Sequence, residues 1–128
     1  MTTAPVLAHV ALSVTDLDRA VRFYTQVLAL REVPRPDFGS PGAWLAMDGA
    51  MVHLAVVDTI PEPRDPFGHF ALNVPTQEVH RLASAVRDGG GTLFGEPGTM
   101  DQLGNTVTVA FCCDTEGNRF ELTDAPPV

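Results

Sequence analysis

Apolar and polar residues alternate in two short stretches of the chain, and these stretches are nearly identical. One is "HVALSV", which begins at His9, and the other is "HFALNV", which begins at His69; four of the six positions are the same. Alternation places successive side chains on opposite faces of a β-strand. Each stretch therefore predicts a strand with one apolar face and one face on which a histidine is followed by small or polar residues.

A helix is predicted after each of these strands. The first has Thr15 or Asp16 as its N-cap and the second has Thr76, while glycines at 89–91 end the second helix. The apolar residues at helical spacing are Leu17, Ala20, Val21, Tyr24 and Leu28, then Val79, Leu82, Ala83 and Val86. We expect the apolar strand faces to pack on these two stripes, which leaves the histidine faces turned away from the helices.

The strands that end the two halves also match. "DGAMVHL" and "EGNRFEL" each place an acid before a glycine and a possible metal ligand four positions after it, so His53 corresponds to Glu121. Candidates for two further strands in each half are 31–36, 43–47, 92–95 and 106–114. Each half is thus predicted to run strand, helix, strand, strand, strand.

The proline-rich segment "DTIPEPRDP" is typical of a linker between modules. It divides a single domain, residues 1–128, into a first module at about 6–58, a linker at about 59–66 and a second module at about 67–124. Modules of this size are marginal alone, so we expect their sheets to unite. The prediction is an α+β fold in which two βαβββ modules pair into one curved mixed sheet, with the helices outside and a metal cleft inside.

The amino-acid composition narrows the range of possible functions. The net charge is −8, from 16 acidic residues against 8 basic ones, all of them arginine. This balance argues against nucleic acid or an anionic membrane as a partner, and the lack of lysine excludes Schiff-base catalysis. No apolar run approaches a membrane span and the first residues carry no signal-peptide pattern, so we expect a cytoplasmic protein. Cys112 and Cys113 are neighbours on a predicted strand and therefore point to opposite faces, which disfavours a disulfide between them.

The predicted cleft brings together His9 and His53 from the first half and His69 and Glu121 from the second. Imidazole and carboxylate groups are ligands of Zn²⁺, Ni²⁺, Fe²⁺, Co²⁺ and Mn²⁺, so a divalent transition metal is the expected cofactor. A single histidine on a strand is more often structural than a ligand. Four ligand-type residues in two matched pairs, each on the polar face of its strand, favour a metal site.

Four segments carry a resemblance to a known family: "HVALSVTDLDRAVRFYTQVLAL", "MVHLAVV", "GHFALNV" and "DTEGNRFEL". Together they resemble the vicinal oxygen chelate superfamily of glyoxalases, bleomycin-resistance proteins and extradiol dioxygenases, from Leu7 to about Thr123. The last segment has Thr115 where the family commonly has proline and Glu116 where it commonly has aspartate. The resemblance implies the paired βαβββ fold, a metal in the cleft and usually a homodimer, in which two modules around one cleft sometimes come from different chains.

The resemblance also implies roles for individual residues. By position, His9, His69 and Glu121 match the family's usual metal ligands, and His53 falls where the fourth ligand is commonly Glu or Gln. Glyoxalase I pairs two glutamates across the metal, whereas this chain keeps only Glu121, a departure that argues against a true glyoxalase I. Glu121 is then the expected general base, which would loosen from the metal to move a proton.

Four residues are candidates for orienting a substrate. Ser13, Asn73 and Arg119 lie on the ligand-bearing strand faces, and Trp44 could line the pocket. Arg119 could either pair with Glu121 or bind an anionic substrate. The segments "PRPDFGSPG" and "GEPGTMDQLGN" are predicted to be loops at the rim, where specificity is often set.

The favoured function is a metal-dependent lyase or isomerase acting on a small substrate whose neighbouring oxygens bind the metal. One alternative is an Fe²⁺ extradiol-type dioxygenase that uses His9, His69 and Glu121 as its ligands. Another is a non-catalytic protein that binds a drug or natural product, as in bleomycin resistance. Fosfomycin-type transferases are a further possibility, but the site of such enzymes is more basic than the one predicted here.

Overall fold

The computed structural model describes residues 3–126. Its elements in chain order are β1 (His9–Val14), α1 (Leu17–Arg22), the π-helical segment η1 (Phe23–Val27), β2 (Arg31–Val33), β3 (Gly42–Met47), β4 (Ala50–Val56), β5 (Phe70–Asn73), α2 (Thr76–Asp88), β6 (Thr92–Leu93), β7 (Gly98–Gln102), β8 (Asn105–Cys113) and β9 (Arg119–Thr123). In this described part of the chain, no helix is both long and apolar enough to cross a membrane.

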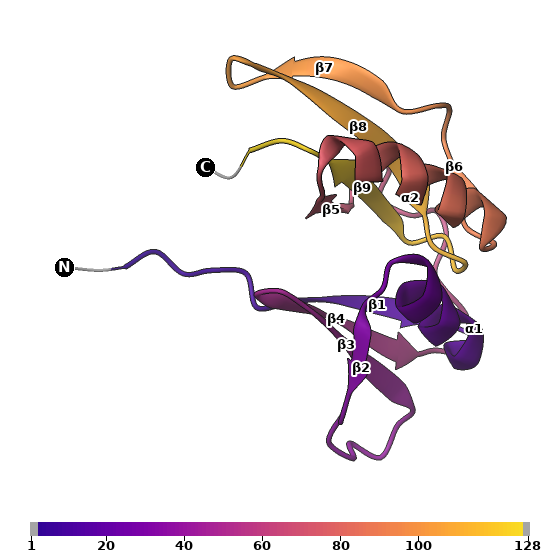
Figure 1. Cartoon of the computed structure of the whole chain (residues 1–128). Coiled ribbons are helices and arrows are strands. Elements are labelled where there is room, and N and C mark those ends of the chain that lie inside the picture. The colour runs from indigo at the N-terminus through magenta and orange to yellow at the C-terminus, as the bar shows by residue number, and fades with distance from the viewer. Residues whose placement is uncertain (1–2, 127–128) are drawn as a thin grey trace.

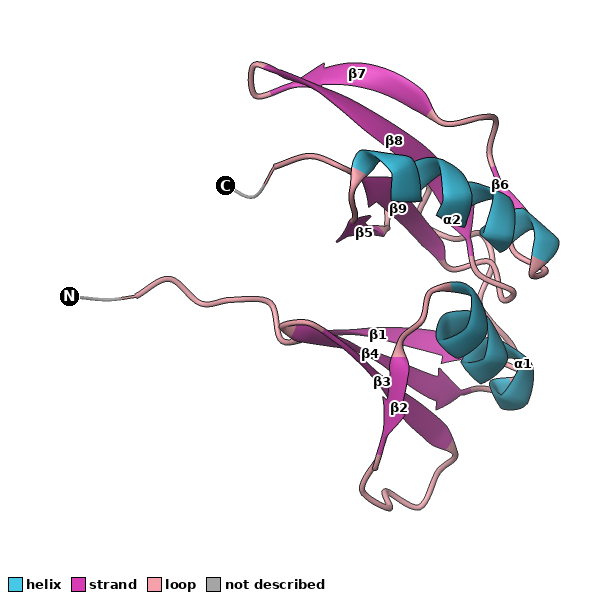
Figure 2. Ribbon diagram, in the orientation of Figure 1, coloured by secondary structure: helices cyan, strands magenta, loops and turns pink. Residues whose placement is uncertain are grey.

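Each half of the chain forms its own mixed sheet (Figure 2). The strand order of the first sheet is β1-β4-β3-β2, with β1 parallel to β4 and the other pairs antiparallel. The second sheet has the order β5-β9-β8-β6, with β5 parallel to β9, and β7 also pairs with β8. The α+β class and the repeated module are therefore confirmed; in the second module β6 and β7 both pair with β8 and together take the place that β2 has beside β3. Each module places its first strand beside its last.

The segment 95–105 differs from its prediction as a rim loop, because it contains β7 and the start of β8. Leu103 and Gly104, with φ of 49° and 79°, form the two-residue turn that a tight hairpin requires. Every residue of β7 is exposed, so the strand has no buried face. Apolar alternation, on which the strand predictions rest, is therefore missing here.

Each helix covers one face of its sheet, as predicted (Figure 1). Along β1 His9 and Ala11 are exposed while Val10 and Leu12 are half-buried, so the histidine lies on the face away from the helix. In the first half α1 packs on β3 and β4, and in the second α2 packs on β8 and β9. Both halves contribute to one core, whose most deeply buried side chains include Val14, Phe23, Tyr24, Leu45, Val52, Leu54, Val79, Val86, Phe120 and Leu122. The core thus lies on the helix side of each sheet and leaves the opposite faces open.

The two modules were predicted to share one sheet, but in a single chain they form two separate sheets. Within residues 3–126, no strand of one sheet pairs with a strand of the other. The halves meet instead through contacts between η1 and α2 and through the turn at 114–118, which we call the inter-module turn. Packing of helix on helix, rather than strand on strand, therefore fixes how the two modules lie.

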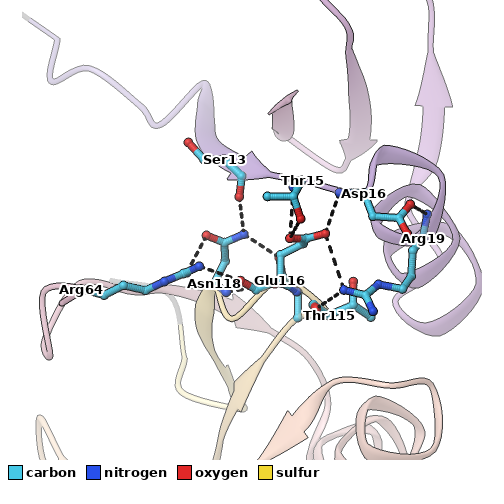
Figure 3. Close-up of polar contacts among 9 residues, drawn as sticks. Ser13, Thr15, Asp16, Arg19, Arg64, Thr115, Glu116 and Asn118 are labelled. Carbon is cyan, nitrogen blue, oxygen red and sulfur yellow. Dashed lines mark hydrogen bonds and ion pairs between the residues drawn. The ribbon is translucent and has the colours of Figure 1, made fainter. Parts of the chain in front are cut away.

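The inter-module turn is held against the start of α1 mainly by Glu116 (Figure 3). Its carboxylate accepts hydrogen bonds from the backbone N–H groups of Thr15 at 3.1 Å and Asp16 at 2.9 Å, and from the Thr15 hydroxyl at 2.9 Å. The guanidinium of Arg19 lies 3.6 Å from the same carboxylate. A carboxylate from the second module therefore satisfies unpaired N–H groups at a helix start in the first.

Two further hydrogen bonds join the modules on either side of Glu116. The side-chain amide of Asn118 donates to the carbonyl of Ser13 at 3.1 Å. The hydroxyl of Tyr24 donates to the Asp114 carboxylate at 2.6 Å, in the buried core. Because these bonds are directional, they set the orientation of the modules as well as their contact.

Candidate metal site

Three rings are stacked on the open face of the first sheet. The ring centres of His9 and His53 are 3.9 Å apart with planes at 14°, and those of Trp44 and His53 are 4.3 Å apart with planes at 6°. Strand register produces this stack, because His53 lies opposite Ala11 on β1 and opposite Trp44 on β3. His9 and His53 therefore lie side by side on the open face of the first sheet, and their role as metal ligands stays a prediction.

The imidazole of His53 has an unused ring nitrogen. Its Nε2 is buried and has no hydrogen-bond partner among the described residues. Burial lowers the pKa of His53, and the neighbouring His9 and the positive charge of Arg35 lower it further. A neutral imidazole with an unpaired buried nitrogen costs free energy unless a ligand or a cation uses that nitrogen.

The second pair consists of His69, just before β5, and Glu121 on β9. Nδ1 of His69 lies 2.7 Å from the carbonyl of Phe67, which can only accept, so Nδ1 carries the proton. In the neutral ring Nε2 then presents a lone pair, and it lies 3.5 Å from Oε2 of Glu121. Two electron-rich atoms at this separation favour a cation or a proton between them.

The two pairs occupy equivalent places in the two modules. His53 lies opposite Ala11, two residues after His9, and Glu121 lies opposite Ala71, two residues after His69. The strand register therefore confirms that His53 and Glu121 are equivalent positions, as the sequence predicted. Within residues 3–126, however, no three His, Cys, Asp or Glu side chains come close enough to hold one metal ion. Each module carries half of a ligand set, and one chain alone does not bring the halves together.

These donors fit a divalent transition metal. Three imidazoles and one carboxylate are the ligand types that zinc, nickel, iron, cobalt and manganese accept. The unpaired Nε2 of His53 is the observation that calls for a cation, and the facing Nε2 of His69 and Oε2 of Glu121 can hold either a cation or a proton. The hydrogen bond that Nδ1–H of His69 donates to the Phe67 carbonyl also fixes the tautomer that leaves Nε2 free to bind a metal.

Two of the predicted substrate residues are engaged in hydrogen bonds within the chain. The backbone of Ser13 accepts from Asn118, and its side chain remains on the ligand-bearing face of β1. The side-chain amide of Asn73 donates to the carbonyl of Ala125. Their part in binding a substrate stays a prediction.

Arg119 lies beside the second pair but is not joined to its carboxylate. Its Nη1 donates to the carbonyl of Pro66 at 2.6 Å, and its guanidinium carbon is 6.0 Å from the ring centre of Phe94. Among the described residues, the ion pair of Glu121 within 4.0 Å is with His69 and none is with Arg119. Of the two roles considered for Arg119, pairing with Glu121 is therefore not observed.

Sequence reasoning missed two residues near the ligand pairs. Phe111 lies opposite Glu121 on β8, just as Trp44 lies opposite His53 on β3. The signal was present in the sequence, because each aromatic residue follows an alanine in a predicted strand shortly before the ligand. Arg35, whose charge acts on His53, lies where the candidate strand 31–36 overlaps a predicted rim loop, and no pattern there linked it to the ligands.

The comparisons with known proteins agree with this architecture. Two βαβββ modules with equivalent ligand-type pairs on their open faces define a vicinal oxygen chelate protein. The sequence profile of the Glyoxalase/Bleomycin resistance protein/Dioxygenase superfamily matches residues 6–122, and the chain belongs to this superfamily. The resemblance predicted from the four segments is thereby confirmed.

The related proteins narrow the class further. The lactoylglutathione lyase GLX1 of Arabidopsis thaliana is 32% identical over 93% of this chain, which spans only 44% of the length of that relative. The lactoylglutathione lyase of Haemophilus influenzae is 30% identical and matches over 92% of this chain and 91% of its own. These relatives make the chain a glyoxalase-like member of the superfamily.

A solved structure shows the same fold. It is a variant of the fosfomycin resistance protein FosX from Listeria monocytogenes, complexed with Mn(II) and 1S,2S-dihydroxypropylphosphonic acid. The TM-score is 0.78 at 16% identity, over 97% of this chain and 95% of that one. At this identity the likeness concerns the fold alone.

Proposed function

We propose that this protein is a metal-dependent lyase or isomerase of the glyoxalase type, and that two copies of the chain complete each metal site. The observation that carries the proposal is the second pair, in which Nε2 of His69 and Oε2 of Glu121 face each other at 3.5 Å. The unpaired Nε2 of His53 in the equivalent pair supports it.

In this proposal His9 and His53 of one copy, with His69 and Glu121 of a second copy, hold one divalent ion. When bound, the ion supplies Lewis acidity that stabilises negative charge on two neighbouring oxygens of the substrate. The ligand set suits zinc, nickel, cobalt, manganese or iron. Iron would favour the dioxygenase alternative, whereas the other metals favour the lyase or isomerase.

Glu121 is the general base of the proposed reaction. It takes a proton from the carbon beside the substrate carbonyl and returns it to the neighbouring carbon, so that an α-hydroxy carbonyl compound is isomerised without an external oxidant. The side chain of Glu121 is only 16% exposed, which limits exchange of that proton with water. His69, fixed by the Phe67 carbonyl, keeps the carboxylate in place.

The relatives suggest which substrate to test first. Those described above are lactoylglutathione lyases. The corresponding substrate for this chain is a hemithioacetal, the adduct of a 2-oxoaldehyde and a thiol, because it carries two neighbouring oxygens and a carbon-bound proton between them. The product would be the thioester of a 2-hydroxy acid, in which the carbon-bound proton has moved to the former carbonyl carbon and the hydroxyl proton to the former carbonyl oxygen, so that all atoms are retained.

Two copies are proposed because, within residues 3–126 of one chain, no three of these ligand-type side chains lie close enough to hold one metal ion. The inter-module turn and the contact of η1 with α2 join the modules on the helix side of both sheets. The ligand pairs lie on the opposite, open faces. In a two-fold dimer, the first module of each copy can face the second module of the other, which makes two identical sites.

The decisive experiment uses two double variants with different non-histidine tags. One carries His9→Ala and His53→Ala, the other His69→Ala and Glu121→Gln, and the heterodimer is isolated through both tags. If sites form between copies, each variant alone binds no metal, while the heterodimer regains one intact site and about half of the wild-type metal per chain. Hemithioacetal isomerase activity should return with the metal.

Circular dichroism and size-exclusion chromatography of each double variant show whether it folds and pairs like the wild type. A heterodimer that stays free of metal would mean that each site lies within one chain. A wild-type protein that binds no transition metal even after reconstitution would sink the enzyme and leave the binding-protein alternative.

A further inference from the structure

A hollow of about 450 Å³ adjoins the second ligand pair, and its wall is largely aromatic. Its lining includes Phe67, Phe94, Phe111 and Phe120, with His69 and Arg119. The side chains of Phe67, Phe94 and Phe111 are 85%, 52% and 44% exposed. Large apolar side chains gathered in the open around a concave site are a mark of ligand binding, and the volume lies in the range of small-molecule pockets.

The hollow lies beside the candidate metal ligands His69 and Glu121. Phe111 lies directly opposite Glu121 in the pairing of β8 with β9, so both side chains are on the open face of the second sheet. His69, which faces Glu121, also lines the hollow. A substrate whose oxygens reached these ligands would therefore place its next substituent among the phenylalanine rings.

Charge at the rim indicates what else the substrate carries. Arg119 lines the hollow and lies beside Phe94, and in the described chain no carboxylate is within 4.0 Å of its guanidinium. Four of the eight arginines have no carboxylate within 4.0 Å among residues 3–126, and Arg119 is the one of these four that lines the hollow. A carboxylate of the ligand is the natural partner for a guanidinium at this position.

We propose that the hollow selects ligands with an aromatic ring, and that Arg119 binds a carboxylate of the same molecule. An aromatic 2-hydroxy acid, the acid contained in the proposed thioester product, carries both groups. The inference rests on the proposed function for the position of the neighbouring oxygens. It goes further in naming the substituent, since the lactoyl group in the names of the relatives carries only a methyl group in place of the ring. Aromatic faces around a flat ring add stacking to the burial of its surface.

The test is calorimetric binding of two anions that share a 2-hydroxy acid group, mandelate with a phenyl ring and lactate with a methyl group. Wild-type protein should bind mandelate about tenfold or more tightly than lactate. Phe111→Ala should remove most of that preference, because it removes the ring beside Glu121. Arg119→Gln should weaken the binding of both anions and keep their ratio.

Leu103→Ala is the matched control, because Leu103 is 79% exposed at the tip of the β7–β8 hairpin and lies outside this hollow. It should leave both affinities unchanged. Circular dichroism checks that each variant is folded. Equal affinity for the two anions, binding of neither, or an unchanged preference in Phe111→Ala overturns the inference.

A parallel assay separates this inference from the proposed function. Turnover is measured with the glutathione hemithioacetals of methylglyoxal and phenylglyoxal. Selective mandelate binding without any turnover would sink the proposed reaction and keep the aromatic site. Turnover of both adducts at equal kcat/KM, without a preference for mandelate, would sink the aromatic site and keep the reaction.

Discussion

Trp44 lies parallel to His53, with ring centres 4.3 Å apart and ring planes 6° apart. The two residues are direct neighbours across β3 and β4, so the contact is set by strand register and not by a mobile loop. Trp44 is also the sole tryptophan of the chain. Its fluorescence therefore reports on the first half of the candidate metal site without any label.

We expect Ni²⁺ or Co²⁺ to quench the fluorescence of Trp44 in a saturable way, because an open-shell metal bound at His53 would lie beside the indole. His53→Ala should abolish the quenching. His80→Ala is the control, since His80 is exposed on α2, and it should titrate like the wild type. Equal quenching in the His53 variant would show that the metal binds elsewhere.

Glu116→Gln should destabilise the protein by about 1.5–3 kcal/mol at pH 7, the usual range for hydrogen bonds to a charged group. The carboxylate is 4% exposed and accepts three hydrogen bonds from Thr15 and Asp16. Urea unfolding measures the change. Glu96→Gln is the control; Glu96 is 83% exposed and 3.9 Å from Arg87, so its loss should cost less than about 1 kcal/mol.

The pH dependence of this difference has a definite sign. Burial raises the pKa of Glu116, but hydrogen bonds from Asp16 and Thr15 and the charge of Arg19 outweigh it, so the pKa lies below its ordinary value of 4.5. A carboxyl whose pKa is lowered by folding stabilises the native state above its unfolded pKa and loses that contribution as pH falls. Wild type and Glu116→Gln should therefore converge in stability below about pH 4.5. A constant difference down to pH 3 would contradict this.

Tyr24 should make the protein unfold in alkali. Burial raises its pKa well above 10.0, and the charge of Asp114 and the hydrogen bond to it raise the pKa further. A raised pKa favours the neutral phenol in the folded state, so this contribution is complete below pH 10.0 and is lost as pH rises. Because the chain has a single tyrosine, absorbance at 295 nm follows it alone. Ionisation should coincide with the loss of ellipticity, and ionisation in a folded chain would contradict the prediction.

Gly42→Ala should destabilise the first sheet by about 1–3 kcal/mol. A β-carbon at Gly42 would collide with the backbone carbonyl of Leu54 and approach the Arg35 guanidinium to 2.8 Å. Gly98→Ala is the matched control, because Gly98 also begins a strand and a β-carbon there meets nothing within 4 Å. It should change stability by less than about 1 kcal/mol. Thermal unfolding of the two variants compares them directly.

The sequence predicted the repeated module well, because each prediction rested on burial. His9 and His69 stand at the start of strands whose other faces are half-buried or buried, so alternation marked both strands. The exposed strand β7 offered no such pattern and was taken for a loop. Buried and half-buried strands are therefore readable from periodicity, and a hairpin in solvent is not.

The arrangement of the two modules relative to each other could not be predicted from local sequence patterns. It depends on contacts between residues about a hundred positions apart, such as Glu116 with Thr15 and Asn118 with Ser13. In the sequence Glu116 looked like a turn residue equivalent to Asp48, whose side chain is exposed. Only one member of this matched pair joins the modules, and a repeat pattern does not show which.

The pairing of β1 with β4 and of β5 with β9 has a consequence for biosynthesis. In each module the first strand pairs with the last one, so neither sheet is complete until its final strand has been synthesised. The strands of the first sheet are all present once Val56 has been synthesised, whereas the second sheet needs β9, which ends at Thr123, 67 residues later (123 − 56). The inter-module turn and the shared core therefore form after the first sheet has all of its strands.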